Sequence, residues 1–426
     1  MSGALGETPG SVPAPTNRLW SGQAQMPSVL ARQVEIVAAD GNYVITRDGQ
    51  RLFDTTAALW HTNIGHAREE MARTAAEQMA RLETYHVFGR FVNDKAVELA
   101  DRISALSPID DPRIILGSGG GDGVDSALKL ARRHWQLAGQ PEKTWVLSRE
   151  SGYHGLHGYG TAVAGIPFNR EGYGSESLIP ETARIDLHSV EKVEQTIQEI
   201  GPERIAAMIA EPIIGSGGVI PPVEGYLEGL QELARRYDIL FIVDEVITGF
   251  GRTGEWFASH RWGLEPDMIT FAKGVSSGYS PVGGVIVAPR VWDAFYKDAD
   301  SPIYRHGITY SGHATSAALA LTNLDILERE GLVSRAAELE KVLQRELTAL
   351  EQHERVREIR SAGFLAGVAL VDGVDGPALA DRLIDRGFTS RVLPGNALQI
   401  SPPFTTTDEE VRTLVAGIKD ALDSSA

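Results

Sequence analysis

Short apolar runs rich in β-branched residues alternate along this chain with amphipathic stretches, and this alternation restricts the fold more than any other feature. Several runs are followed by apolar residues at helical spacing, as at Val124, Leu128, Ala131 and Trp135. Such an alternation is typical of an α/β fold with a mostly parallel central sheet. The expected strands are Ile114–Leu116, Trp145–Leu147, Ala207–Ala210, Leu240–Val243, Ile269–Ala272 and Val285–Ala288.

The residue pattern changes near Ser316, where a long stretch with helical periodicity begins. Because a chain of 426 residues exceeds the usual size of a single core, we expect two domains. The larger domain is expected over 61–315 and a smaller α+β domain over 316–426. An N-terminal segment over 18–60 is expected to join the smaller domain. Residues 1–17 are rich in Gly, Pro, Ser and Ala but lack a basic start and an apolar core, so we expect a flexible tail and no signal peptide.

The composition excludes several classes of partner. A formal net charge of −17 repels nucleic-acid phosphates and anionic lipid headgroups, and no stretch approaches the ~18 apolar residues of a membrane helix. We therefore expect no nucleic-acid or membrane partner, and a cytoplasmic location. The absence of cysteine excludes disulfides and cysteine metal sites.

The first candidate site is the glycine loop Gly117–Gly123, which follows an expected strand and precedes an expected helix. Bare backbone amides at a helix N-terminus favour an anion, and a phosphate suits that position. The structural alternative is a tight turn that needs positive φ. A dinucleotide fingerprint is a second alternative, but its G-x-G-x-x-G spacing is absent.

Two further candidates end apolar strands. Asp244 and Glu245 follow Leu240–Val243, at the end where open α/β sheets bind ligands, so we expect one acid to meet a cation. A metal-binding aspartate is the alternative, although no histidine ligands lie nearby at suitable spacing. Lys273 ends another strand, and a desolvated lysine amine is a nucleophile for Schiff-base chemistry. The alternative is an exposed lysine at a strand end.

An anion-binding loop, an acid and a reactive lysine are together the groups that pyridoxal phosphate requires. The segment Phe241–Gly254, with Pro266-Asp267 and Ala272-Lys273-Gly274 after it, resembles the class III aminotransferases of fold type I. Within them it is most similar to the ω-amino-acid or amine:pyruvate group. The resemblance implies a large domain with a mostly parallel sheet, a smaller α+β domain, and ping-pong transfer from an amine donor to a keto acid, with pyruvate as the expected acceptor.

Carried over position by position, the resemblance implies a role for each residue of the cofactor site. Lys273 is expected to hold the cofactor as a Schiff base, while Asp244 keeps the pyridine nitrogen protonated. Tyr153, the third catalytic residue, is expected to stack on the ring, with Val246 on the opposite face; a core aromatic is the alternative for Tyr153. The other residues expected to bind the cofactor are Gly120, Gly121, Asp122, Glu211 and Thr309.

The phosphate loop departs from the family's usual Ser-Gly-Ser-Glu-Ala pattern, because here it reads Gly119-Gly120-Gly121-Asp122-Gly123. Two side-chain hydroxyls are missing, so the backbone amides must contribute more, with Ser118 as a candidate substitute. We expect weaker cofactor retention. Nearby, His154 and His157 have the spacing of a metal pair, but no carboxylate or third ligand accompanies them, and no metal is expected.

The residues expected to bind substrate or a second subunit rest on the resemblance alone. Thr309 matches a residue that reaches the phosphate from the neighbouring subunit, which implies a homodimer with shared active sites. Arg391 matches a mobile arginine that clamps an α-carboxylate, with a surface arginine as the alternative. Trp60 matches a pocket tryptophan and Phe88 is expected on the same wall, although a core role suits either aromatic.

One substitution separates the branches of the family. In the ornithine and 4-aminobutyrate branches a glutamate pairs with the mobile arginine, whereas this chain has Ser216 in that place. Other class III specificities, including a diaminopelargonate-like one, stay open. A pyridoxal-phosphate decarboxylase or epimerase is disfavoured by the matches at Arg391 and Trp60. A non-catalytic cofactor-binding scaffold is disfavoured by the intact Lys273 and Asp244.

Overall fold

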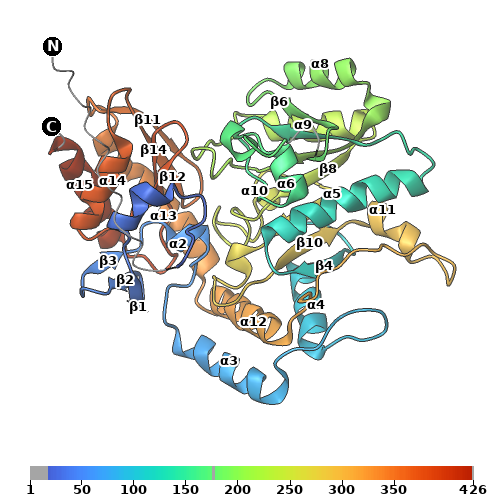
Figure 1. Ribbon diagram of the computed structural model, residues 1–426, viewed down its shortest axis with the longest axis horizontal. Helices are drawn as coiled ribbons and strands as arrows, with labels where there is room; N and C mark the ends of the chain where they lie inside the picture. The colour runs from blue at the N-terminus through green and yellow to red at the C-terminus, as the bar shows by residue number, and fades with distance from the viewer. Residues whose placement is uncertain (1–17, 175–177, 425–426) are drawn as a thin grey trace, which may run out of the picture.

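The computed structural model describes residues 18–174 and 178–424, so the tail expected over 1–17 lies outside the described residues. The chain forms a larger lobe around a central sheet and a smaller lobe that contains the C-terminal helices (Figure 1). Within the described residues, no helix combines the length and apolarity that crossing a membrane requires.

A seven-stranded sheet forms the centre of the larger lobe, and only β10 runs opposite to the other six strands. The α/β class and the mostly parallel sheet are therefore confirmed, and each of the six expected strands is present within one or two residues. The edge strand β6 was not expected, because its polar sequence lacks the apolar run of a buried strand. In sheet order the strands are β4 (Arg113–Gly117), β10 (Gly283–Val287), β9 (Met268–Phe271), β8 (Leu240–Asp244), β7 (Ile205–Ala210), β5 (Trp145–Arg149) and β6 (Thr182–Ile185).

Helices cover both faces of this sheet. On one face α5 (Gly120–Leu137), α6 (Gly158–Val163) and α11 (Pro289–Trp292) contribute to one apolar cluster, and on the other α8 (Val190–Ile200) and α9 (Tyr226–Arg236) form a second. Successive residues of β8 belong alternately to the two clusters. Leu240 and Ile242 lie in the cluster of α5, and Phe241 and Val243 lie in the other. Asp244 continues this alternation, so it lies on the same side of the sheet as α5.

The lobes are connected through α12 (Ala314–Arg329), which packs against α3 (Glu69–Leu82) and α4 (Asp94–Leu106) and also contacts α13 (Leu332–Leu347). The long helical pattern that begins near 316 is therefore present as two helices. They are separated by Gly331, whose φ of +63° a glycine adopts without strain. The expected domain boundary at 316 falls inside α12. The division into two domains stays a prediction.

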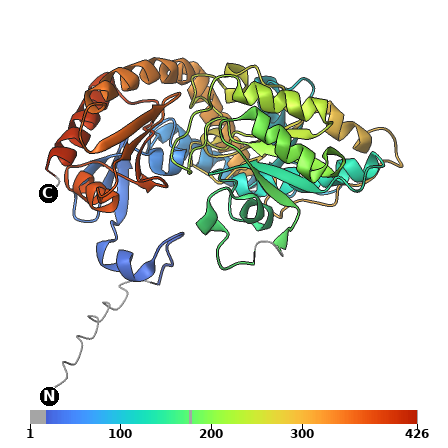
Figure 2. The same ribbon diagram turned by 90° about the horizontal axis from the view of Figure 1, so that it is seen from above.

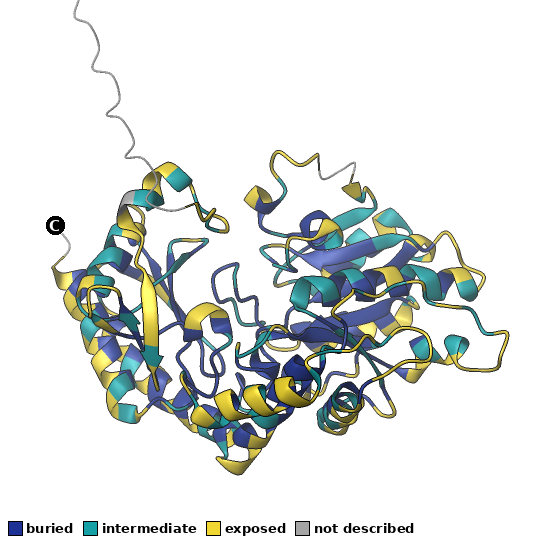
Figure 3. Cartoon of the chain, turned by 60° about the horizontal axis from the view of Figure 1, so that its bottom comes forward, coloured by how far each residue is buried: buried dark blue, intermediate teal, exposed yellow. Residues whose placement is uncertain are grey.

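The smaller lobe contains a four-stranded antiparallel sheet in the order β11 (Val356–Ser361), β12 (Ala366–Leu370), β14 (Ala397–Ile400) and β13 (Val392–Leu393). The N-terminal segment lies beside this lobe, since Phe53 donates its amide to Gly387 O at 2.7 Å and accepts from Thr389 N at 2.9 Å (Figure 2). Buried residues follow the inner strands of the seven-stranded sheet, while many exposed residues lie on the outer faces of the helices (Figure 3). The remaining elements are β1 (Ile36–Asp40), β2 (Tyr43–Thr46), β3 (Arg51–Phe53), α1 (Met26–Val29), α2 (Ala57–Trp60), α10 (Ala258–Arg261), α14 (Gly376–Asp385) and α15 (Asp408–Asp423).

Candidate active site

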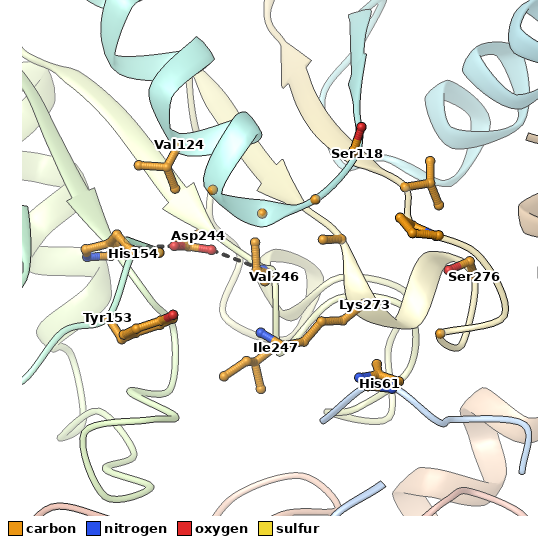
Figure 4. A pocket seen from close by; sticks show the side chains of 18 of the residues that line it. His61, Ser118, Val124, Tyr153, His154, Asp244, Val246, Ile247, Lys273 and Ser276 are labelled. Carbon is orange, nitrogen blue, oxygen red and sulfur yellow. Dashed lines mark hydrogen bonds and ion pairs between the residues drawn. The ribbon is translucent and has the colours of Figure 1, made fainter. Parts of the chain in front are cut away.

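A cavity of about 360 Å³ lies where β8 and β9 end and α5 begins (Figure 4). It brings together residues from segments that are far apart in the sequence. Of the predicted cofactor residues, those that line it are Gly120, Gly121, Tyr153, Glu211, Asp244, Val246 and Lys273. This edge is the carboxyl end of the parallel strands, where α/β sheets bind their ligands.

The glycine loop provides the anion-binding part of the cavity. The helix α5 begins at Gly120, so unpaired amides of its first turn lie at the cavity. A Cβ on Gly120 would stand 2.8 Å from a methyl group of Val246, so this position requires glycine. The carboxylate of Asp122 turns back onto the loop, where it accepts a hydrogen bond from Ser118 N at 2.8 Å. Asp122 does not line the cavity itself but an adjoining hollow.

Lys273 is partly buried beside the cavity, and desolvation lowers its pKa to about 8 even though the negative charges of Asp244 and Glu211 oppose the shift. Its φ of +49° lies in the left-handed region, which costs a non-glycine residue roughly 1 kcal/mol or more. The lowered pKa leaves a larger fraction of neutral, nucleophilic amine near pH 7 than an exposed lysine has.

Asp244 is buried and is oriented by two hydrogen bonds. Its Oδ2 accepts from the Nδ1 of His154 at 2.7 Å, and its Oδ1 accepts from Val246 N at 3.1 Å (Figure 4). The adjacent Glu245 is equally buried but caps α10, accepting from Ala258 N at 2.6 Å and from a second backbone amide. Of the two acids that the sequence places here, only Asp244 lines the cavity.

Glu211 connects the loop of Tyr153 to the cavity. Its carboxylate accepts from Tyr153 N at 2.8 Å and from Gly215 N at 3.0 Å, and burial raises its pKa. Burial also raises the pKa of the Tyr153 hydroxyl, which keeps this ring neutral well above pH 7. An aromatic ring at the edge of the cavity is suited to stacking.

Two histidines of this site were missed by the sequence prediction. His154 orients Asp244, and His61 lines the cavity, where burial and the charge of Lys273 lower its pKa. Apart from the spacing of His154 and His157, their only sequence signal is that each follows a predicted site residue, Tyr153 and Trp60 respectively. Among the described residues, no cluster of three or more acidic or histidine side chains could hold a metal ion.

A second, larger cavity shares Tyr153 and Lys273 with the first and is lined by two of the three predicted substrate residues. Trp60, Tyr153, Lys273 and Arg391 all line it, and so does Ser216. Burial lowers the pKa of the Arg391 guanidinium, and in the described chain only the Tyr153 hydroxyl offsets part of that shift. A cation that no carboxylate pairs is available to a substrate anion.

Phe88 and Thr309 lie elsewhere in their own chain. Phe88 is 44% exposed and faces Gly307, whose added Cβ would stand 2.9 Å from its ring, and it does not line the Trp60 cavity of its own chain. Thr309 lines the hollow that contains Ser118 and Asp122, outside the cavity that holds Lys273. In a single chain Phe88 and Trp60 do not line the same cavity, and the expectation that they form one wall stays a prediction.

These residues fit pyridoxal phosphate. The glycine loop offers amides to a phosphate, the buried carboxylate of Asp244 suits a pyridinium nitrogen, and the amine of Lys273 suits an aldehyde carbon. The clash between a Gly120 Cβ and Val246 also shows that the loop is built for close backbone approach. The fold and the site together define an enzyme of the fold-type I class that uses this cofactor.

Comparison with known proteins agrees with this class. Residues 26–422 match the family model for class III aminotransferases. The chain is 35% identical to the diaminobutyrate–2-oxoglutarate transaminase of Halomonas elongata, over 91% of this chain and 90% of that protein. It is 34% identical to the putrescine–pyruvate aminotransferase of Pseudomonas aeruginosa, over 92% of this chain and 91% of that protein.

Solved structures give the same result. A transaminase from the marine bacterium Virgibacillus superposes with a TM-score of 0.91 at 34% identity, over 95% of this chain and 96% of that one. An amine transaminase from an uncultivated Pseudomonas species, solved with pyridoxal phosphate bound, gives a TM-score of 0.90 at 33% identity, over 96% and 99% of the two chains. The chain belongs to the class III aminotransferases. It is therefore a pyridoxal-phosphate enzyme that transfers an amino group from an amine to a keto acid.

Proposed function

We propose that this enzyme takes the amino group from a primary amine or an ω-amino acid and transfers it to pyruvate. The observation that carries the proposal is a single cavity lined by both Lys273 and Arg391, whose guanidinium has no carboxylate partner in the described chain. Ser216, which stands in place of the family's pairing glutamate, lines the same cavity and offers no charge. Arg391 is thus available for the carboxylate of a small keto acid.

Each residue of the site then has a defined task. Bound pyridoxal phosphate supplies the electron sink for loss of the donor's Cα proton. The amine of Lys273 moves that proton, and Asp244, oriented by His154, holds a proton at the cofactor nitrogen. Tyr153 and Val246 keep the ring in position from the sides of the cavity. Arg391 binds the keto acid through paired hydrogen bonds and swings aside for an amine that lacks a carboxylate.

Related proteins support pyruvate as the acceptor. The names of the putrescine–pyruvate and β-alanine–pyruvate aminotransferases of Pseudomonas aeruginosa, 34% and 33% identical, include this keto acid. The 35% identical diaminobutyrate transaminase is named for 2-oxoglutarate instead. The second carboxylate of 2-oxoglutarate would be favoured by a second cation in the cavity, and Arg391 is the only arginine or lysine besides Lys273 among the described residues that line it.

The proposed active unit is a cytoplasmic homodimer with shared sites. Phe88 and Tyr310 are 44% and 66% exposed, and the ring of Phe88 faces Gly307, two residues before Thr309. Such an exposed aromatic surface is typical of a subunit interface. In the dimer, Thr309 would complete the phosphate site of the partner. Light scattering of the purified enzyme should give about twice the chain mass of 46.1 kDa, and a monomer with full activity would contradict this part of the proposal.

The substrate proposal is tested by following the two half-reactions separately. The pyridoxal form is mixed with simple amines, ω-amino acids and α-amino acids, and the decay of its long-wavelength absorbance is measured. The aminated enzyme is then mixed with pyruvate or with 2-oxoglutarate. We expect simple amines or ω-amino acids to react, and pyruvate to restore the pyridoxal form faster than 2-oxoglutarate. A clear preference for 2-oxoglutarate would overturn the assignment of the acceptor.

A further inference from the structure

The glycine loop presents no side chain to the cavity at positions 119–121. The imidazole of His157, however, lies against the backbone of this loop. A Cβ on Gly121 would lie 3.2 Å from both Nδ1 and Cε1 of His157. The ring of His157 thus occupies the space that a side chain at position 121 would take. His157 comes from a different segment, at the start of α6, and reaches the loop only through the fold.

The surroundings of His157 favour a polar role over packing alone. Its side chain is 55% exposed, and it lines both the hollow next to Ser118 and the larger cavity. Its Nδ1 lies 3.6 Å from Oδ1 of Asp122, whose other oxygen accepts from Ser118 N. Asp125 is a second acid close enough to interact with it. The imidazole therefore lies beside these carboxylates and against the backbone of Gly121 at the start of α5.

We propose that His157 supplies to the cofactor phosphate a side-chain hydrogen bond that Gly119, Gly120 and Gly121 do not offer. An imidazole N–H is a donor of suitable geometry, and a hydrogen bond to a charged phosphate is stronger than one between neutral groups. The proposal depends on the cofactor of the family and is independent of the amine and keto acid proposed above.

The test measures cofactor binding by apoenzyme, with no turnover involved. Dissociation constants are determined for pyridoxal phosphate and for pyridoxal, which lacks the phosphate, with wild type, H157F and H157Q. The phenylalanine keeps a ring without donors, and the glutamine keeps a donor without the ring. We expect H157F to weaken pyridoxal phosphate binding at least tenfold and pyridoxal binding less than twofold, with H157Q retaining most of the affinity.

A second pair of variants tests the site from the other side. G121S should bind pyridoxal phosphate more weakly than wild type, because its side chain meets the imidazole. The double variant G121S/H157A should regain affinity over H157A, since the serine hydroxyl then has room to replace the missing donor. H188A, which removes an exposed histidine elsewhere, is the control.

Two outcomes would overturn the proposal. Wild-type affinity for pyridoxal phosphate in H157F would show that the ring only packs against Gly121. Equal losses for pyridoxal phosphate and pyridoxal would show that His157 acts on the shape of the cavity and not on the phosphate. Thermal unfolding of each apoenzyme variant verifies that the fold is intact.

Discussion

At the scale of single residues, Lys273 combines partial burial, a left-handed backbone and two nearby carboxylates. We predict that K273A loses at least about 1000-fold in transamination, because it removes both the attachment point and the proton carrier. Lys143 is also buried but lies outside the cavity, so K143A is the matched control and should keep its turnover in the folded fraction. Steady-state rates measure both. Turnover near wild type in K273A would refute the mechanism.

The lowered pKa of Lys273 gives a second prediction at this scale. Only the neutral amine attacks the cofactor, so cofactor capture by the apoenzyme should rise about tenfold per pH unit below a pKa of about 8 and level off above it. At pH 7 about 10% of the amine is neutral, against well under 0.1% for an unshifted lysine. Stopped-flow absorbance measures the rate, with a free lysine derivative as the control for ionisation of the cofactor. A rate that still rises tenfold from pH 9 to 10 would contradict the shift.

The adjacent acids provide a third prediction. D244N should bind cofactor yet lose at least about 100-fold in activity, because a neutral amide does not hold the proton at the ring nitrogen. E245Q should keep its activity but lose roughly 1–3 kcal/mol of unfolding free energy, since one amide of the α10 cap loses its acceptor. Kinetics and denaturant titrations separate these effects. A D244N variant within ~10-fold of wild type, worth only ~1.4 kcal/mol, would exclude the proposed role.

At the scale of elements, the turn from β4 into α5 contains adjacent glycines with different requirements. A Cβ on Gly120 would meet Val246 at 2.8 Å, whereas a Cβ on Gly119 meets nothing within 4 Å. We predict that G120S weakens pyridoxal phosphate binding at least tenfold, while G119S binds as well as wild type or better because its hydroxyl adds a donor. Equilibrium titration of the apoenzymes measures both. Equal behaviour of the two variants would show that the contact with Val246 is unimportant.

At the scale of the whole molecule, the larger cavity is formed by both lobes, since Arg391 comes from the smaller lobe and Lys273 from the larger. We predict that R391A slows the pyruvate half-reaction by roughly 30- to 1000-fold. The variant loses the charge-assisted bidentate pair between the guanidinium and the pyruvate carboxylate, which contributes on the order of 2–4 kcal/mol. The half-reaction with a simple amine has no such contact and serves as the internal control. Single-turnover absorbance separates the two. Equal losses would mean that Arg391 is structural.

The sequence by itself predicted the features that depend on local order. Buried strands appear as apolar runs and packed helices as periodic apolar positions, so the α/β class and the mostly parallel sheet were predicted correctly. The ends of two such runs also identified Lys273 and Asp244 as candidates, because in a parallel sheet these ends meet at one edge. A polar edge strand such as β6 has no comparable signal and was missed.

The tertiary structure alone decided which groups meet. The local sequence pattern does not distinguish Asp244 from Glu245. In the structure, strand alternation directs Asp244 to the cavity, whereas Glu245 caps α10. It does not reveal that His154 orients Asp244, since 90 residues separate the two. Nor does it show that Phe88 lies away from the cavity of its own chain. Each of these contacts joins distant segments, and side-chain periodicity within a segment contains no information about the partner against which the segment packs.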